Sequence, residues 1–129
     1  MTAVESRGGP LRGARFRPAQ RLRRPGEFKS AYATGRRFGN ELFTATVRPN
    51  DGPGARLGLS IAARTVGNAV SRNRLRRLVR EEFRHQQHTL PAADIVIGAR
   101  SAARTASAPL LREALQRLWQ QINEAWARS

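Results

Sequence analysis

The sequence contains no cysteine, two histidines and only nine acidic residues among its 129 residues. Without cysteine the chain has no disulfide, no thiolate metal ligand and no cysteine nucleophile. The acidic residues are scattered rather than grouped into the carboxylate clusters that hold catalytic metal ions, and no such cluster lies near His85 or His88. A Walker-type phosphate loop and a GxSxG nucleophile motif are also missing. We therefore expect no catalytic residue, no metal site and no small-molecule cofactor in the protein itself.

Long apolar segments are missing as well. No run of the sequence approaches the roughly 18 apolar residues that a membrane-spanning helix needs. The arginines near the N-terminus are not followed by the apolar stretch of a secretory signal. These absences predict a cytoplasmic protein without a membrane partner.

Arginine is the residue that the sequence has in excess. Of 24 basic residues all but Lys29 are arginine, and the formal net charge is +15. Such an excess attracts polyanions, and the planar guanidinium group fits phosphate and stacks on nucleobases, which the lysine ammonium group cannot do. Hydrophobic residues make up 40% of the chain, which is enough for a modest core. Composition alone therefore indicates a folded protein that binds nucleic acid or an anionic membrane surface.

The apolar residues are distributed unevenly along the chain. Residues 1–20 contain few of them among glycines, prolines and arginines, which predicts a basic, disordered tail. Residues 21–126 show regular apolar patterns, and they predict a single RNA-binding α+β domain.

Within this domain the apolar period alternates between that of a helix and that of a strand. The turn residues at 49–54 indicate that the two strands beside them run antiparallel to each other. The predicted elements are a helix over 25–34, strands over 43–47 and 57–61, a long helix from Gly67-Asn68 to Gln87, a strand over 94–99, and a last helix that is capped by Ser107 or Ala108. This order, α-β-β-(β)-α-β-α, predicts helices packed on a small mixed sheet.

The long central helix separates apolar residues from arginines. At 100° per residue, one side collects Leu75, Leu78, Val79 and Phe83. The opposite side collects Asn73, Arg76, Arg77, Arg80 and Arg84, and Arg72 and Arg74 flank the apolar stripe. Like charges at i and i+4 repel one another, so a one-sided arginine column favours a polyanion-binding face over a merely solvated one. The helix has no tryptophan and its apolar side is needed for the core, which argues against a membrane surface.

Residues 67–81, GNAVSRNRLRRLVRE, closely resemble the signature of the bacterial ribonuclease P protein component. The resemblance covers roughly residues 16–122. Further matches are Phe16, Arg21-Leu22, Glu27-Phe28, Tyr32 and Gly35 before the signature, and Phe83-Arg84, Leu90-Pro91, Asp94–Val96 and Leu115-x-x-Leu118-Trp119 after it. The arginine-asparagine-arginine block in this setting is highly specific, whereas basic helices in general are not.

The resemblance implies the protein subunit of a ribonucleoprotein endonuclease that removes the 5′ leader from precursor tRNA. In that family the RNA subunit carries catalysis with bound divalent metal, expected to be Mg²⁺, and the protein binds the ribonuclease P RNA and the leader. The family fold is an α-β sandwich with a left-handed βαβ crossover, a fold similar to the second domain of a ribosomal protein. The general rule for parallel strands would have predicted a right-handed crossover.

The resemblance also implies roles for individual residues. Six positions on the signature helix are expected to contact the catalytic RNA: Arg72, Asn73, Arg74, Arg76, Arg77 and Arg80. The leader-binding cleft is expected to contain Phe28 and Tyr32 on the first helix, Phe43 on the strand that forms its floor, and Arg64. At the place of Arg64 many relatives have adjacent lysines. The i, i+4 spacing of Phe28 and Tyr32 by itself favours a core-facing stripe, whereas the resemblance favours an aromatic platform for single-stranded leader nucleotides.

A different binding protein fits the charge, size and α+β content equally well. This alternative is a ribosomal-protein-like binder of structured RNA that has no processing role. Only the signature helix and its flanking matches argue against it.

Overall fold

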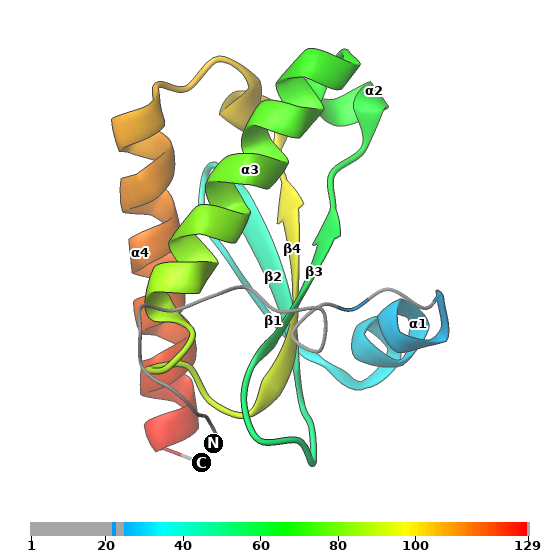
Figure 1. Cartoon of the computed structure of the whole chain (residues 1–129), viewed down its shortest axis with the longest axis vertical. Coiled ribbons are helices and arrows are strands. Elements are labelled where there is room, and N and C mark those ends of the chain that lie inside the picture. The colour runs from blue at the N-terminus through cyan, green and yellow to red at the C-terminus, as the bar shows by residue number, and fades with distance from the viewer. Residues whose placement is uncertain (1–21, 23–24, 129) are drawn as a thin grey trace.

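The chain folds into three layers, with a four-stranded sheet between one short helix and two long ones (Figure 1). The structure is a computed structural model that describes residue 22 and residues 25–128, without the side chains at positions 25, 30, 32, 63 and 64. The predicted disordered tail over residues 1–20 lies outside the described residues.

Most of the predicted elements are present where the sequence places them. The first helix has the predicted bounds, and the two long helices begin directly after Asn68 and Ser107. The sequence predicts a third strand before the long helix only as an option without bounds, and it does not predict the short helix α2 or the 3-10 helix η2. The elements are α1 (Pro25–Thr34), β1 (Arg36–Gly39), β2 (Phe43–Pro49), β3 (Arg56–Ser60), α2 (Ala63–Val66), α3 (Ala69–Gln86), β4 (Ala93–Ala99), η2 (Ser101–Arg104) and α4 (Ala108–Ala127).

The strand order in the sheet is β1-β2-β4-β3, so β2 and β3 run antiparallel to each other as predicted but are not neighbours. Strand β4 lies between them, antiparallel to β2 and parallel to β3. The physical reason is burial: β4 is buried on both faces from Ala93 to Ile97, and every residue of this segment except Asp94 is apolar, which suits a central position in a sheet. The turn residues at 49–54 do reverse the chain, but they leave room for a strand between the two that they connect.

The connection between the parallel strands β3 and β4 crosses the face of the sheet that carries α3. In Figure 1 both strands run upward, β4 lies to the left of β3, and α3 lies in front of the sheet. This arrangement makes the β3–α2–α3–β4 crossover left-handed, as the family resemblance implies and against the general preference for right-handed crossovers.

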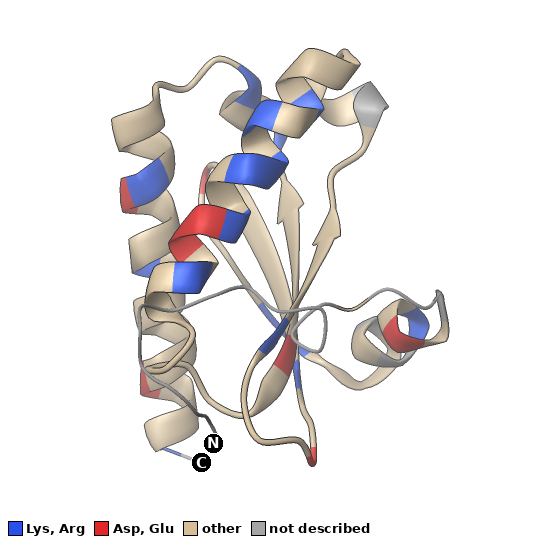
Figure 2. Ribbon diagram, viewed as in Figure 1, with Lys and Arg blue, Asp and Glu red and all other residues tan. Residues whose placement is uncertain are grey.

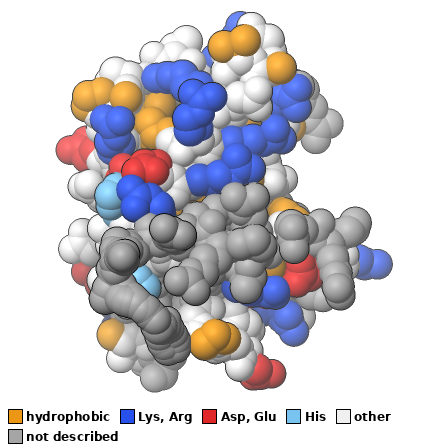
Figure 3. Space-filling view, viewed as in Figure 1, with side chains coloured by type: hydrophobic (Ala, Val, Ile, Leu, Met, Phe, Trp, Pro, Cys, Tyr) orange, Lys and Arg blue, Asp and Glu red, His pale blue; other side chains and the backbone are white. Residues whose placement is uncertain are grey.

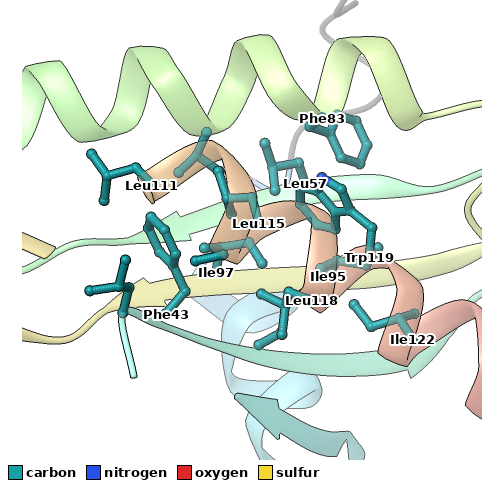
Figure 4. Close-up of a cluster of buried hydrophobic side chains, with 14 of the residues drawn as sticks. Phe43, Leu57, Phe83, Ile95, Ile97, Leu111, Leu115, Leu118, Trp119 and Ile122 are labelled. Atoms are coloured by element: carbon teal, nitrogen blue, oxygen red, sulfur yellow. The ribbon is translucent and has the colours of Figure 1, made fainter. Parts of the chain in front are cut away.

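The main core lies between the sheet and the two long helices (Figure 4). Side chains alternate along each strand, so Phe43 on β2 and Ile95 and Ile97 on β4 point toward this core. Phe83 of α3 meets Trp119 of α4 edge to face, with their ring centroids 6.3 Å apart. On the other face of the sheet, α1 packs over a smaller cluster formed by Leu22, Ala31 and Val96.

Local features explain where the helices begin and end. Gly67 adopts a φ of +92°, which only glycine adopts readily, and the Asn68 side chain then caps α3 by accepting from the Ser71 amide at 2.9 Å. Gly35 follows α1 because a side chain there would collide with the carbonyl oxygen of Ala31, 2.4 Å from the Cβ position, and with Thr46 on β2. The close approach of α1 to the sheet therefore requires glycine at position 35.

The burial of α3 leads to a stability prediction. Leu75 is 1% exposed, whereas Leu78 is only partly buried against the core. We expect Leu75→Ala to lower the free energy of unfolding by about 2–5 kcal/mol, because it leaves a cavity under the sheet-facing side of α3. Leu78→Ala should lower it by less. Urea unfolding of both variants checks this order, and an equal loss for both would contradict the assigned orientation of α3.

Candidate nucleic-acid interface

Helix α3 carries the six residues that the resemblance assigns to RNA contact. The buried side of the helix consists of Leu75, Val79 and Phe83, so the remaining positions face outward or lie at its edges. Figure 2 shows that arginine recurs along α3, and Figure 3 shows basic side chains gathered on the face of the molecule where α3 lies. The six residues therefore share one helix and one exposed region of the molecule.

The six residues differ in burial, and Arg76 does not lie opposite the core as predicted. Asn73, Arg74, Arg77 and Arg80 are exposed, while Arg72 and Arg76 are partly buried. The reason is that the buried side of α3 centres on Val79 and Phe83, because Leu78 is only partly buried. At 100° per residue, positions 72 and 76 fall beside that centre. These two arginines thus flank the core-facing side, and the exposed four form the outward surface.

Arg84 near the end of α3 is neutralised within the helix. Its guanidinium group donates to both carboxylate oxygens of Glu81, at 2.5 and 3.3 Å. The ring nitrogen Nε2 of His85 lies 3.1 Å from the same carboxylate. The hydrogen bond from Arg84 holds the pKa of Glu81 below its ordinary value. Arg84 is therefore occupied by a partner within α3.

The other carboxylate of α3 is directed away from the signature arginines. Glu82 is partly buried and faces Arg112 of α4, with 3.7 Å between Glu82 Oε2 and Arg112 Nε. In the part of the chain that the structure describes, no carboxylate forms an ion pair with Arg76 or Arg77. At Arg76 and Arg77 the signature helix thus presents positive charge that no described acidic side chain compensates, which is the electrostatic property expected of a phosphate-binding face.

A second candidate surface is the face of the sheet that carries α1. Helix α1 covers Thr46 and Val96 on this face. It leaves Thr44 and Gly98 partly exposed and Ser60 exposed. The side chains that line the uncovered part are small or absent, so the backbone of the sheet is accessible there.

Phe28 borders this uncovered face. Its ring packs over Gly58, where an added Cβ would lie 3.0 Å from the ring, and the side chain remains partly exposed. Beyond Thr44 the surface is hollowed toward Thr65 and Arg100. An aromatic side chain beside a flat floor of small residues is an arrangement on which an extended single strand of nucleic acid can stack.

The assignment of Phe43 to this cleft is wrong. Phe43 is 0% exposed and lies in the main core on the opposite face of the sheet (Figure 4). Because strand side chains alternate between faces, it is Thr44 and Thr46 of β2 that point toward α1. The floor of the cleft is therefore formed by small polar residues and glycine rather than by an aromatic ring.

Two further assignments fall on side chains outside the described residues. The backbone of Tyr32 belongs to α1, one turn after Phe28, and the backbone of Arg64 belongs to α2 in the crossover. Their side chains are not described, so their proposed contacts with the leader remain predictions.

Sequence reasoning missed the residues that face α1 from the sheet. Gly58 and Ser60 alternate with Leu57 and Leu59 in β3, so the period-two pattern contains the signal. The face on which α1 lies is a matter of tertiary packing, and the pattern does not contain it. Sequence reasoning also missed Arg56, whose side chain connects α1 to the sheet.

Within residue 22 and residues 25–128, no group of three His, Asp or Glu side chains is arranged to hold a metal ion. None of the described helices combines the length and the apolarity that crossing a membrane requires.

Comparison with known proteins places the chain in a family. The model of the family Ribonuclease P matches residues 16–123. The chain is 39% identical over 109 residues to the ribonuclease P protein component of Thioalkalivibrio sulfidiphilus, covering 84% of this chain and 90% of that protein. It is 36% identical over 103 residues to that of Aliivibrio salmonicida, covering 80% and 88%.

Solved structures agree with the sequence comparison. The ribonuclease P protein of Thermotoga maritima superposes with a TM-score of 0.71 at 33% identity, covering 79% of this chain and 96% of that one. The protein from Staphylococcus aureus gives a TM-score of 0.74 at 27% identity, covering 78% and 93%.

The left-handed crossover and the arginine-covered helix that it carries define a class of small, basic α+β proteins that act with nucleic acid. Within that class, the chain belongs to the ribonuclease P protein family. It is therefore a protein component of ribonuclease P, an endoribonuclease that is a ribonucleoprotein.

The positive charge of the signature helix leads to a prediction about salt. If the five arginines among the six signature positions each neutralise about one phosphate, the logarithm of affinity for ribonuclease P RNA should fall with the logarithm of salt concentration with a slope of about −4.5. Arg77→Ala should make this slope less negative by about 1. Arg117→Ala is the matched control, because it removes one positive charge on α4 that is already paired with Glu41. A slope that Arg77→Ala leaves unchanged would mean that Arg77 contacts no phosphate.

Proposed function

We propose that this chain assists removal of the 5′ leader from precursor tRNA by using two surfaces, the signature side of α3 for the RNA subunit and the α1 face of the sheet for the leader. The observation that carries the first assignment is that Arg76 and Arg77 of α3 form no ion pair with any described acidic side chain. Phosphates of a folded RNA supply the missing negative charge, and guanidinium groups bind them through two hydrogen bonds at once.

The second assignment is supported by the shape of the α1 face. Phe28 stands beside Gly58, and the open floor next to it has small side chains such as Thr44. Stacking on an aromatic ring is tolerant of base identity, which suits a protein that handles leaders of many sequences. Tyr32 on the same helix and Arg64 on the crossover are the further residues that we assign to this site.

The proposed division of labour follows from the chemistry of the side chains. Hydrolysis of a phosphodiester needs stabilisation of the attacking and leaving oxygens, which bound Mg²⁺ provides in many nucleases. The described part of this chain offers no carboxylate cluster for such ions, so we assign them to the RNA subunit. The protein contributes binding and orientation: its arginines reduce the repulsion between two RNA molecules, and its cleft holds the leader extended. This activity belongs in the cytoplasm, together with precursor tRNA.

Reconstitution tests the proposed function. We expect the protein to rescue cleavage of precursor tRNA by a bacterial ribonuclease P RNA at low magnesium concentration, because its cations replace part of the ionic screening. The protein alone should not cleave. Binding of structured RNA without any rescue of cleavage would favour the ribosomal-protein-like alternative, and cleavage by protein alone that is lost in a carboxylate variant would contradict catalysis by the RNA.

Phe28 provides the test of the leader site. We expect Phe28→Ala to weaken binding of precursor tRNA to the holoenzyme by about 1–3 kcal/mol, the usual value of one base–aromatic stack, and to leave binding of mature tRNA nearly unchanged. Stability should fall only slightly, because the ring is partly exposed.

The matched control is Phe38→Ala. Phe38 is partly buried on the other side of the sheet, beside Trp126. The substitution Phe38→Ala therefore removes an aromatic ring without changing the α1 face. Equal losses for precursor and mature tRNA in Phe28→Ala, together with a large drop in melting temperature, would return Phe28 to the role of a core residue.

A further inference from the structure

Arg56 of β3 forms a bridge between α1 and the central strand of the sheet. Its Nε and Nη2 donate to the two carboxylate oxygens of Asp94 on β4, at 2.8 and 2.9 Å. Its remaining nitrogen, Nη1, donates to Glu27 Oε2 at 2.8 Å. One guanidinium group therefore holds a carboxylate of the sheet and a carboxylate of the helix at the same time.

The sheet half of this bridge is rigid. The Asp94 side chain is only 4% exposed, and Asn50 donates a further hydrogen bond to Asp94 Oδ1 at 2.9 Å. The paired hydrogen bonds to Asp94 fix the plane of the Arg56 guanidinium group and raise its pKa above its already high value. Arg56 is thus a fixed cation, and its remaining nitrogen, Nη1, points toward α1.

The contact with α1 is made at the residue next to Phe28. Glu27 lies in the first turn of α1, and its side chain is 26% exposed. The apolar contacts of α1 with the sheet are few among the described residues: Ala31 is fully buried over Val96, and Phe28 packs partly against the same cluster. Directional contacts such as this ion pair therefore add to the placement of α1 that these described apolar contacts provide.

We propose that Glu27 and Arg56 are positioning residues for the leader site, which set the height of α1 above the sheet and so place the Phe28 ring over Gly58. This inference rests on the proposed function of the α1 face. It assigns the specificity of the cleft in part to an ion pair that itself touches no nucleic acid. The ion pair fixes the helix before the leader arrives, so binding does not have to order it.

Electrostatics makes this inference distinguishable from a simple charge effect. A carboxylate near a surface that binds a polyanion repels that polyanion, so its removal should strengthen binding if charge alone matters. A positioning role predicts the opposite sign, because removal of Glu27 frees α1. The direction of the change therefore separates the two explanations.

The experiment compares Glu27→Ala with Glu124→Ala in the reconstituted holoenzyme. Both variants remove one negative charge, and Glu124 is exposed near the end of α4, in the layer on the other side of the sheet. We avoid Arg56→Ala because it leaves the buried Asp94 carboxylate without its partner and endangers folding. We expect Glu27→Ala to reduce the preference for precursor over mature tRNA about three- to tenfold, as loss of one charged hydrogen bond can do. Glu124→Ala should leave this preference unchanged.

Phe28→Ala and the double variant complete the test. If Glu27 acts through Phe28, Glu27→Ala combined with Phe28→Ala should be no worse than Phe28→Ala alone, since the two effects are then coupled. Affinity for the RNA subunit should be the same in all variants. The variants should cleave precursor tRNA at the normal rate when the holoenzyme is saturating. Their cleavage rate should fall only at low holoenzyme concentration, as expected for a defect in binding.

The outcomes are separable. A preference that Glu27→Ala leaves intact or increases, with or without a lower melting temperature, overturns the positioning role and leaves Arg56 a purely structural bridge. Additive losses in the double variant also overturn it. If Phe28→Ala itself leaves the preference for precursor tRNA unchanged, the proposed leader site is wrong, whatever Glu27→Ala does.

Discussion

The parallel pairing of β3 with β4 is the constraint on which the rest of the structure depends. Two parallel neighbours cannot be joined by a tight turn, so the chain must return across one face of the sheet before β4 begins. Helices α2 and α3 are that return. Because α3 lies on the core side, its apolar residues are held against β3 and α4, and the signature arginines are forced outward or to the edges. The fold thus converts an amphipathic sequence into a charged surface with a fixed orientation.

Arginine serves two different purposes in this molecule, and the neighbouring carboxylates decide which. Arg56 is partly buried between Asp94 and Glu27. These two carboxylates neutralise its charge, and the ion pairs join α1 to the sheet. Arg77 is exposed on α3 without a described acidic partner, so its charge is available to an external anion. A net charge of +15 therefore overstates how many cations can meet RNA. The distribution of nine carboxylates is as informative as the excess of arginine.

Local chemistry allowed much of the fold to be predicted. The N-terminal starts of three helices follow from Pro25, Asn68 and Ser107, because each of these residues acts within one turn of the chain. The partner of each strand could not be predicted in this way, because the alternation in β2 and β3 is the same whether they pair with each other or with β4. The prediction that Phe43 lies in the cleft was wrong for a related reason. Alternation shows that successive residues of a strand face opposite sides of the sheet, but helices distant in sequence decide which layer covers each side.

The error about Arg76 has a different origin and bears on the candidate site. An apolar stripe on a helix is broad, and its centre depends on which of its members are buried. Partial exposure of Leu78 and full burial of Phe83 move that centre toward Arg72 and Arg76. Long arginine side chains tolerate such edge positions, since their methylene groups pack against apolar neighbours while the guanidinium group reaches outward. The signature therefore spans the boundary between core and surface, which couples the placement of these two cations to the packing of α3 on the sheet.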